Sequence, residues 1–290
     1  ISDERKRNRV KGRYDPKKPQ HKAYVRRKYS KYQGMKIVDN RELWDYVEEK
    51  LLDDQSPPNI AGRVTKHEKH LPSISKNSIY RFIASPYGRK IEYYRSKRKS
   101  RRGRRRLRTP SLKDRTFIDQ RPRIINQRRR VGDAEADFIV SGKTGKGIIL
   151  VVVCRKSRAP FLERITQVTI PNVHQAFQNI QRRFPELKTI TTDNDLLLQH
   201  HKELERLLGV NIYFCHPYHS WEKGTVENIN GYIMKDIPKG SDISTYSKRF
   251  IRSIETKLQR RILACIDHRT PREVIENARK RKQRRGAVKN

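Results

Sequence analysis

The chain has 290 residues, of which 69 are Lys or Arg and 31 are Asp or Glu, so its formal net charge is +38. A charge of this size indicates a polyanionic partner such as nucleic acid and argues against an ordinary small-molecule enzyme. The longest apolar run has eight residues, Gly147 to Cys154. A membrane-spanning helix needs roughly 20, so we expect no membrane insertion. The three cysteines lie far apart in the sequence, so we expect neither a disulfide framework nor a cysteine zinc site.

Charge is unevenly distributed along the chain. Residues 1–130 carry a net charge of +26, and residues 131–290 carry +12 and nearly all the long apolar runs. This pattern predicts basic DNA-contacting segments followed by a globular core. Residues 1–38 read as a basic arm in which Lys, Arg and Tyr alternate, which suits phosphate contact with occasional base stacking. A solvated, disordered tail explains the same composition equally well.

The segment 39–90 predicts a small helical module. Asp39 and Glu42 resemble a capping box, and apolar residues at helical spacing follow them. Ser56 precedes two prolines and can begin a second helix, and Ser75 can cap a third. A polar third helix after a linker is typical of a helix-turn-helix, with a plain three-helix bundle as the alternative. The residues expected to contact DNA in this module are Arg63, Lys76, Asn77, Ser78 and Arg81.

A basic linker is expected at 91–130, because ten of the fourteen residues in 95–108 are Lys or Arg. No packed core can form from such a composition. A segment that follows DNA phosphates is the simplest interpretation, and a nuclear-localisation signal is the weaker one. Further DNA contacts are expected from Arg101, Arg102, Arg104, Arg105 and Arg106.

The segment 131–240 predicts an α/β layer fold around a mixed five-stranded sheet. Residues 134–140 alternate, so they form a strand that carries Glu135 and Asp137 on one face. Residues 147–154 are continuously apolar, which indicates a buried central strand. Short connections make the first three strands an antiparallel meander. The remaining predicted elements are a strand at 161–165, a helix that begins near Pro171, a strand at 187–192, a helix at 196–208, a strand at 211–215 and a helix at 225–235.

Three carboxylates can converge in this order of elements. Asp137 lies in the first strand, Asp193 at the end of the fourth, and Glu227 on the helix after the fifth. Converging carboxylates repel one another unless cations neutralise them, and hard oxygen ligands select Mg²⁺ or Mn²⁺. Two such ions can activate a water or a hydroxyl and stabilise the leaving oxygen of a phosphodiester. The pattern therefore predicts a site that cuts or joins nucleic acid strands.

The sequence around these carboxylates carries a resemblance. The segments 131–139, 192–194 and 217–231, continued by 238–242 and 270–273, resemble the insertion-sequence-30 family of bacterial transposases. The stretch from Trp221 to Gly240 is the specific part. The match also reaches back through 57–83, where this family has a helix-turn-helix.

The resemblance implies a ribonuclease-H-like integrase catalytic core with an Asp-Asp-Glu triad. By position the triad is Asp137, Asp193 and Glu227, with the family's spacing of 33 residues between the last two. It implies two bound Mg²⁺ ions, with Mn²⁺ as a substitute, and a polynucleotidyl transferase that performs 3′-end cleavage and strand transfer of an insertion sequence. It also implies double-stranded DNA (element ends and target site) as partner, a homo-oligomer on that DNA, and a cytoplasmic, nucleoid-associated protein. Residues expected to support the metal ligands or contact the strand are Asn194, His219, Trp221, Asn228 and Asn230.

The sequence also departs from the family pattern. Asp195 and Leu197 stand where the family usually has Gly and Glu. These substitutions favour an alternative, a catalytically degenerate transposase-derived protein that binds specific DNA sequences. A basic RNA-binding structural protein would explain the charge but not the carboxylates. The chain begins at Ile1, and the family's first DNA-binding segment is short or missing, which is consistent with a fragment. Residues 241–290 are expected to form C-terminal helices and a basic tail.

Overall fold

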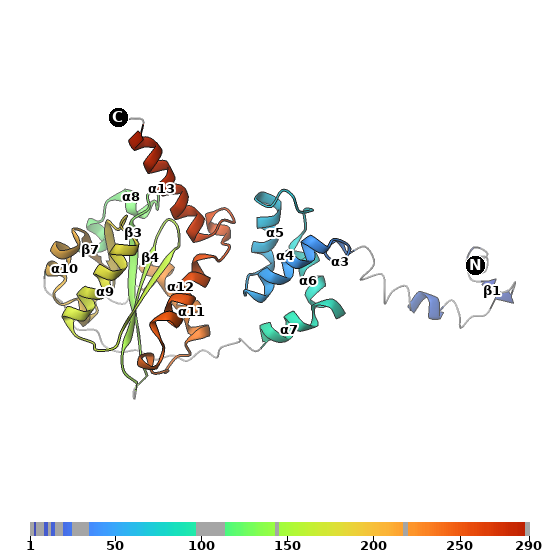
Figure 1. Ribbon diagram of the computed structural model, residues 1–290, viewed down its shortest axis with the longest axis horizontal. Helices are drawn as coiled ribbons and strands as arrows, with labels where there is room; N and C mark the ends of the chain where they lie inside the picture. Colours follow the sequence, from blue (N-terminus) through green and yellow to red (C-terminus); the bar gives the residue numbers. More distant parts are fainter. Residues whose placement is uncertain are drawn as a thin grey trace. The chain divides into compact units, whose positions relative to one another are not determined.

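The computed structural model describes residues 35–96, 114–142, 145–216 and 220–287, together with Asp3 and the short segments 9–10, 13–14 and 20–24. The chain divides into two compact units, Ile1–Lys97 and Arg98–Asn290 (Figure 1). Most of the predicted basic arm and the arginine-rich part of the predicted linker lie outside the described residues. The predicted DNA contacts that fall there are Arg101, Arg102, Arg104, Arg105 and Arg106.

The described helices of the first unit enclose a small apolar core. Helix α4 (Arg41–Leu52) buries Leu43, Val47 and Leu51, the residues expected at helical spacing. The prediction that Asp39 caps this helix is wrong. The side-chain oxygen of Asn40 accepts the backbone N–H of Leu43 at 2.8 Å. Asp39 belongs instead to the preceding short helix α3 (Lys36–Asp39).

The second and third predicted helices are present in this unit. Helix α5 (Pro57–Lys66) begins after Ser56, and helix α6 (Lys76–Ile83) begins after Ser75, whose hydroxyl accepts the N–H of Ser78. The 3₁₀ turn η1 (Pro86–Gly88) and helix α7 (Arg89–Ser96) follow.

Helix α6 exposes Lys76, Asn77 and Arg81, whereas Ser78 is half-buried beside the cap. The guanidinium of Arg63 pairs with Glu68 at 2.8 Å. DNA contact by these residues stays a prediction.

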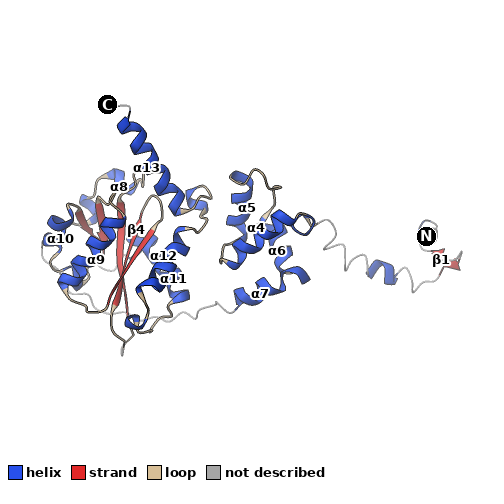
Figure 2. Ribbon diagram, viewed as in Figure 1, coloured by secondary structure: helices blue, strands red, loops and turns tan. Residues whose placement is uncertain are grey.

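The second unit is built on one mixed sheet with strand order β5-β4-β3-β6-β7 (Figure 2). The first three strands are antiparallel, and β6 and β7 run parallel to β3. The predicted mixed five-stranded sheet, with its first three strands as an antiparallel meander, is confirmed. The strands are β3 (Asp133–Val140), β4 (Ile148–Cys154), β5 (Pro160–Ile165), β6 (Thr189–Thr192) and β7 (Asn211–Phe214).

Helices cover both faces of this sheet, and the sheet separates two apolar cores (Figure 1). Helices α9 (Ile170–Arg183) and α10 (His201–Leu208) pack on the face that carries Ala134, Ala136 and Phe138. Helices α11 (Gly224–Asp236) and α12 (Lys248–Gln259) pack on the opposite face with Ile139. The alternation of β3 therefore directs Glu135 and Asp137 toward the α11 side of the sheet.

The predicted helix over 196–208 is interrupted. The structure has a 3₁₀ turn η3 (Leu196–Leu198), then His200, and then α10, which ends at Gly209 in the left-handed conformation with φ of 62°. The other described helical elements are η2 (Ile118–Gln120), α8 (Arg123–Asn126), η4 (Ser220–Lys223), η5 (Ile243–Thr245), η6 (Ala264–Ile266) and α13 (Pro271–Ala287). None of the helices that the structure describes is long and apolar enough to cross a membrane.

Candidate active site

The register of two neighbouring strands brings Asp137 and Asp193 together. Strands β3 and β6 are parallel, and Glu135 pairs with Thr191. Two residues farther along each strand, the chain reaches Asp137 and Asp193. The two carboxylates therefore meet at the same end of the sheet, although 55 residues separate them in the sequence.

A buried lysine links the two carboxylates. The ammonium nitrogen of Lys223 lies 2.9 Å from Oδ1 of Asp137 and 2.7 Å from Oδ2 of Asp193. Lys223 is only 5% exposed. Burial opposes the charge of Lys223, but the two carboxylates outweigh it and raise its pKa. The site thus holds one positive charge between two negative ones.

Burial also raises the pKa of Asp137, and the nearby charge of Asp193 adds to this effect while Lys223 opposes it. Glu227 lies one helical turn after Lys223 on α11 and is exposed. Partial burial raises its pKa, the charge of Lys223 opposes this shift, and the charges of Asp137, Glu135 and Asp193 add to it. Within the described segments, no three His, Cys, Asp or Glu side chains form a ready-made metal centre. The structure joins Asp137 with Asp193 and leaves Glu227 at the edge.

Two asparagines hold this site in place. The amide nitrogen of Asn230 donates to Oδ2 of Asp137 at 2.7 Å, which fixes the carboxylate from the α11 side. The amide nitrogen of Asn194 donates to the carbonyl of Cys215 at 3.0 Å, and its oxygen accepts from Arg115. Asn194 therefore ties the end of β6 to the end of β7, next to Asp193.

Glu135 fixes the start of the helix that carries Glu227. Its buried carboxylate accepts the backbone N–H groups of Thr225 at 2.9 Å and Val226 at 3.0 Å. The hydroxyl of Thr225 and the guanidinium of Arg155 donate to the same carboxylate, at 3.0 and 2.8 Å. Lys223, the N-cap residue of α11, makes no capping side-chain bond. A carboxylate from β3 thus replaces the missing cap and meets the positive end of the helix dipole.

Sequence reasoning missed the roles of Lys223, Glu135 and Arg155. The only signal for Glu135 was its place on the same strand face as Asp137. Of the other predicted site residues, Asn228 is exposed on α11. His219 and the side chain of Trp221 lie outside the described residues.

The two departures from the family pattern have local structural roles. Asp195 caps η3 by accepting the N–H of Leu197 at 2.9 Å. Burial raises the pKa of Asp195, with Asp193 and Asp137 adding to the effect. Leu197 packs against the apolar core on the α9 side. Position 197 therefore supplies packing and offers no acid to the site.

The oxygen atoms of the site suit a divalent cation. The ammonium of Lys223 already contacts both Asp137 and Asp193, so one cation can bind both carboxylates. Among the residues that the structure describes, Oδ1 of Asp193 and Oδ1 of Asn230 are buried acceptors with no hydrogen-bond partner. Unmet buried acceptors are rare in proteins, and carboxylate and amide oxygens are the ligands that Mg²⁺ and Mn²⁺ prefer.

Comparisons with known proteins identify the family. No family model matches the chain. The transposase of IS4351 from Bacteroides fragilis is 34% identical over 224 residues, which cover 75% of this chain and 68% of that protein. The transposase InsI of IS30A from Escherichia coli is 32% identical, with 83% and 66% covered. The transposase of IS1086 from Cupriavidus metallidurans is 30% identical, with 83% and 74% covered.

Among solved structures, the catalytic core domain of BIV integrase is similar, with 18% identity and a TM-score of 0.42. That match covers 52% of this chain and 98% of the integrase domain. The matched relatives extend beyond this chain, which spans about two thirds to three quarters of their lengths. On the sequence identities and coverage above, the chain belongs to the insertion-sequence-30 family of bacterial transposases.

Proposed function

We propose that the second unit cuts and joins DNA strands during transposition, and that Asp137, Asp193 and Glu227 hold two divalent metal ions. The observation that carries this proposal is the meeting of Asp137 and Asp193 at one end of the sheet, with unmet oxygen acceptors beside them. Membership of a transposase family supports the reaction class. The expected products are a free 3′ end and a strand joined to target DNA.

The residues of the site would divide the work. Bound Mg²⁺ or Mn²⁺ would supply the positive charge that activates water or a 3′ hydroxyl and stabilises the leaving oxygen. Asp137, Asp193 and Glu227 would hold the two ions, and Asn230 would keep Asp137 oriented. Lys223 would give up its ion pairs with the two carboxylates. Its ammonium would then be available to a phosphate oxygen of the DNA.

The first unit would supply DNA recognition. The exposed side of α6 carries Lys76, Asn77 and Arg81, which suits insertion of that helix into the major groove of the element ends. Two ends have to be joined in one reaction, so a homo-oligomer on double-stranded DNA is expected. A chain with a net charge of +38 would also associate with the bacterial nucleoid.

A nicking and strand-transfer assay on labelled element-end DNA tests the proposal. Wild-type protein is incubated with Mg²⁺, with Mn²⁺ and with chelator, beside the Glu227→Gln protein. Glu203→Gln, which changes an exposed glutamate on α10, is the matched control. We expect metal-dependent products from the wild type and the control, and none from Glu227→Gln, with DNA binding retained by all three. Wild-type cleavage rates in Glu227→Gln would overturn the assignment.

The second candidate is a catalytically degenerate protein that retains specific DNA binding. The observation in its favour is that Leu197 is apolar and packed in the core where the family usually has Glu. Metal-dependent nicking by the wild type in the same assay would exclude this candidate. Tight duplex binding without any nicking would support it.

A further inference from the structure

A cavity of about 240 Å³ lies on the flank of α11 that faces away from Asp137. The helix side that reaches Asp137 carries Asn230, whereas the cavity is lined by Thr225, Asn228 and Tyr232, which share another face at helical spacing. Residues from four other segments complete its wall. The lining residues on which the inference depends are Arg128, Arg158, Tyr232, Leu258, Arg261 and Cys265.

The charge of this cavity is unbalanced. Its described lining contains three arginines and no carboxylate. Arg158 donates from Nη1 to the hydroxyl of Thr225 at 2.7 Å, but its buried Nε has no partner in the described part of the chain. Burial lowers the pKa of Arg158, and the positive charge of Arg128 lowers it further. Glu135, whose charge acts on Arg158, is already used by Arg155 and the start of α11. An anion would therefore be stabilised here.

The rest of the wall is aromatic and aliphatic. The guanidinium of Arg261 lies 3.9 Å from the ring centre of Tyr232, which is half-buried. Leu258 and Ile229 are buried beside it. Guanidinium planes and aromatic rings are the surfaces on which unstacked bases lie in single-strand binding proteins. The cavity thus offers a cationic rim for a phosphate and an apolar wall for a base.

The surface between Glu227 and the cavity is open. Gly224, Glu227, Asn228 and Gly231 form the exposed strip of α11. A Cβ atom added at Gly224 or Gly231 would meet no other atom within 4 Å. Asn228 lines the cavity and directly follows Glu227 in the sequence. Along this strip, as far as the structure describes it, a DNA strand can therefore cross the helix from the carboxylates to the cavity without meeting a bulky side chain.

We propose that this arginine cavity binds one unstacked nucleotide of the DNA strand whose phosphodiester is held at Asp137 and Asp193. The phosphate lies against Arg128 and Arg158, and the base lies against Tyr232 and Leu258. The proposal rests on the proposed function, because it assumes that the carboxylates receive DNA. It adds a second contact to that strand, one helix width from the reacting phosphate.

Cysteine labelling tests the cavity directly. Cys265 is exposed and lines the cavity, whereas Cys154 and Cys215 are buried. Burial raises the pKa of Cys215 to about 12, with the charge of Glu222 adding to the effect, so this thiol stays protonated at the pH of the experiment. The full chain is treated with a maleimide in chelator, with element-end DNA, with inorganic phosphate or with neither. Gel shift confirms binding, and peptide mass spectrometry reports each cysteine.

We expect element-end DNA to slow labelling of Cys265 at least about fivefold, and phosphate at the same anion concentration to leave it unchanged. Unchanged labelling of Cys265 while DNA is bound would overturn the cavity assignment. Equal protection by phosphate would also overturn it and indicate an adventitious ion only. The same preparation is assayed for metal-dependent nicking. Nicking with an unprotected Cys265 contradicts this inference alone, whereas protection without nicking contradicts the proposed function alone.

A pair of neighbouring arginines gives an independent test. Both arginines are exposed, but Arg128 lines the cavity and the next residue, Arg129, is not part of its wall. Because each lost phosphate contact on duplex DNA changes the slope of log affinity against log salt by about 0.9, we expect Arg128→Ala to flatten this slope by about that amount. Arg129→Ala should leave it unchanged. Equal slopes for the two variants would contradict a specific role for the cavity.

Discussion

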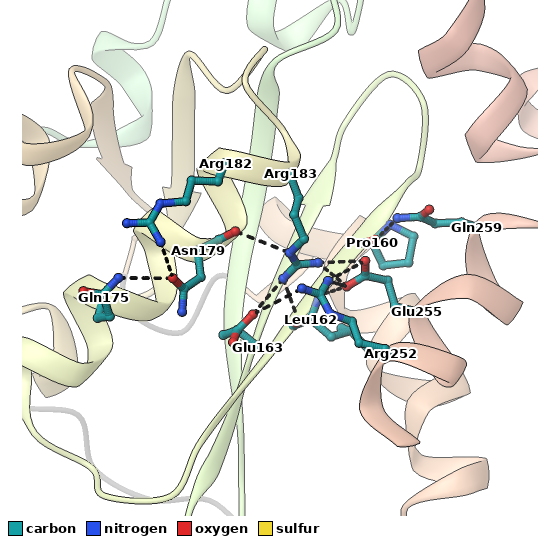
Figure 3. A network of polar contacts seen from close by, with 10 residues as sticks. All are labelled: Pro160, Leu162, Glu163, Gln175, Asn179, Arg182, Arg183, Arg252, Glu255 and Gln259. Atoms are coloured by element: carbon teal, nitrogen blue, oxygen red, sulfur yellow. Dashed lines mark hydrogen bonds and ion pairs between the residues drawn. The ribbon is translucent and has the colours of Figure 1, made fainter. Parts of the chain in front are cut away.

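Two groups of carboxylates, one at the outer strand of the sheet and one at the ends of two inner strands, are neutralised differently. At the outer strand β5, Glu163 and Glu255 face Arg183 and Arg252 (Figure 3). Arg183 reaches both oxygens of Glu255 at 2.7 Å and Glu163 at 2.8 Å, and Arg252 reaches Glu255 at 3.0 Å. We call these four residues the edge cluster. Two acids are matched there by two bases.

The edge cluster also covers the open side of β5. The backbone N–H of Leu162 donates to Glu255 at 2.6 Å, and the carbonyl of Leu162 accepts from Arg183 at 2.9 Å. Unpaired groups on an outer strand would otherwise invite pairing with another chain. Its charges and hydrogen bonds therefore serve the fold.

The site at the ends of β3 and β6 is not matched in this way. Asp137 and Asp193 pair with the same lysine, Lys223, and Oδ1 of Asp193 has no partner among the described residues. The comparison teaches that buried carboxylates alone do not identify a reaction site. What distinguishes the site is a deficit of positive charge and of donors, because that deficit leaves room for metal ions. The following predictions test this difference.

The largest expected effect is on catalysis. Asp193→Asn removes one oxygen charge from the unmatched site, so nicking should fall about a thousandfold, equivalent to about 4 kcal/mol of transition-state stabilisation. Single-turnover nicking measures the loss. Glu163→Gln, the matched change in the edge cluster, should leave the rate per folded molecule unaltered. Equal losses in both variants would erase the distinction between the two groups.

The next effect is on stability, and here the larger loss is expected from the edge cluster. Arg183→Leu leaves two largely buried carboxylates with one arginine, which should cost on the order of 3 kcal/mol of unfolding free energy. Urea denaturation followed by circular dichroism measures it. Asp193→Asn should change this free energy by less than about 1 kcal/mol, because Asp193 is half exposed. A stable Arg183→Leu protein would show that the edge cluster is dispensable.

A smaller effect is expected at Glu135, which contributes to both stability and catalysis. Glu135→Gln weakens the cap of α11 and the pair with Arg155, and should cost about 1–2 kcal/mol of stability. Because α11 carries Glu227, nicking by the folded variant should also fall, about tenfold. Thr225→Val, which removes the hydroxyl bonds to Glu135 and Arg158 but keeps the carboxylate that caps α11, is the control and should change the rate less. A normal rate in Glu135→Gln would mean that the cap does not position Glu227.

The smallest effect concerns Lys223, whose ammonium lies where a metal ion would compete for the same oxygens. Lys223→Met should tighten Mn²⁺ binding by about threefold. The matched control is Lys257→Met, which removes the ammonium of Lys257 on α12 from its ion pair with Asp236 on α11. It should have no effect on Mn²⁺ binding. Calorimetric titration with Mn²⁺ measures both. Weaker Mn²⁺ binding in Lys223→Met would show that the lysine helps to assemble the site.

The order of elements along the chain and the antiparallel pairing of the first three strands could be predicted from the sequence, because apolar patterns and short connections mark them. The neighbouring placement of β3 and β6, which brings Asp137 beside Asp193, is one of the arrangements that this order allows, and the structure shows that it is the one adopted. The link through Lys223 could not be predicted, because it depends on η4 folding back across the ends of β3 and β6. The cap at Glu135 is a contact between residues 90 apart in the sequence. The local sequence pattern also could not decide whether Asp39 or Asn40 caps α4, because both residue types can cap a helix.

The most direct test of the central claim is calorimetric titration of the metal-free protein with Mn²⁺. The wild type is compared with the double variants Asp137→Asn/Asp193→Asn and Glu163→Gln/Glu255→Gln. We predict that Mn²⁺ binding is lost in the first variant and retained in the second, provided that circular dichroism shows both to be folded. Undiminished Mn²⁺ binding by folded Asp137→Asn/Asp193→Asn would contradict the assignment of these carboxylates as the metal site.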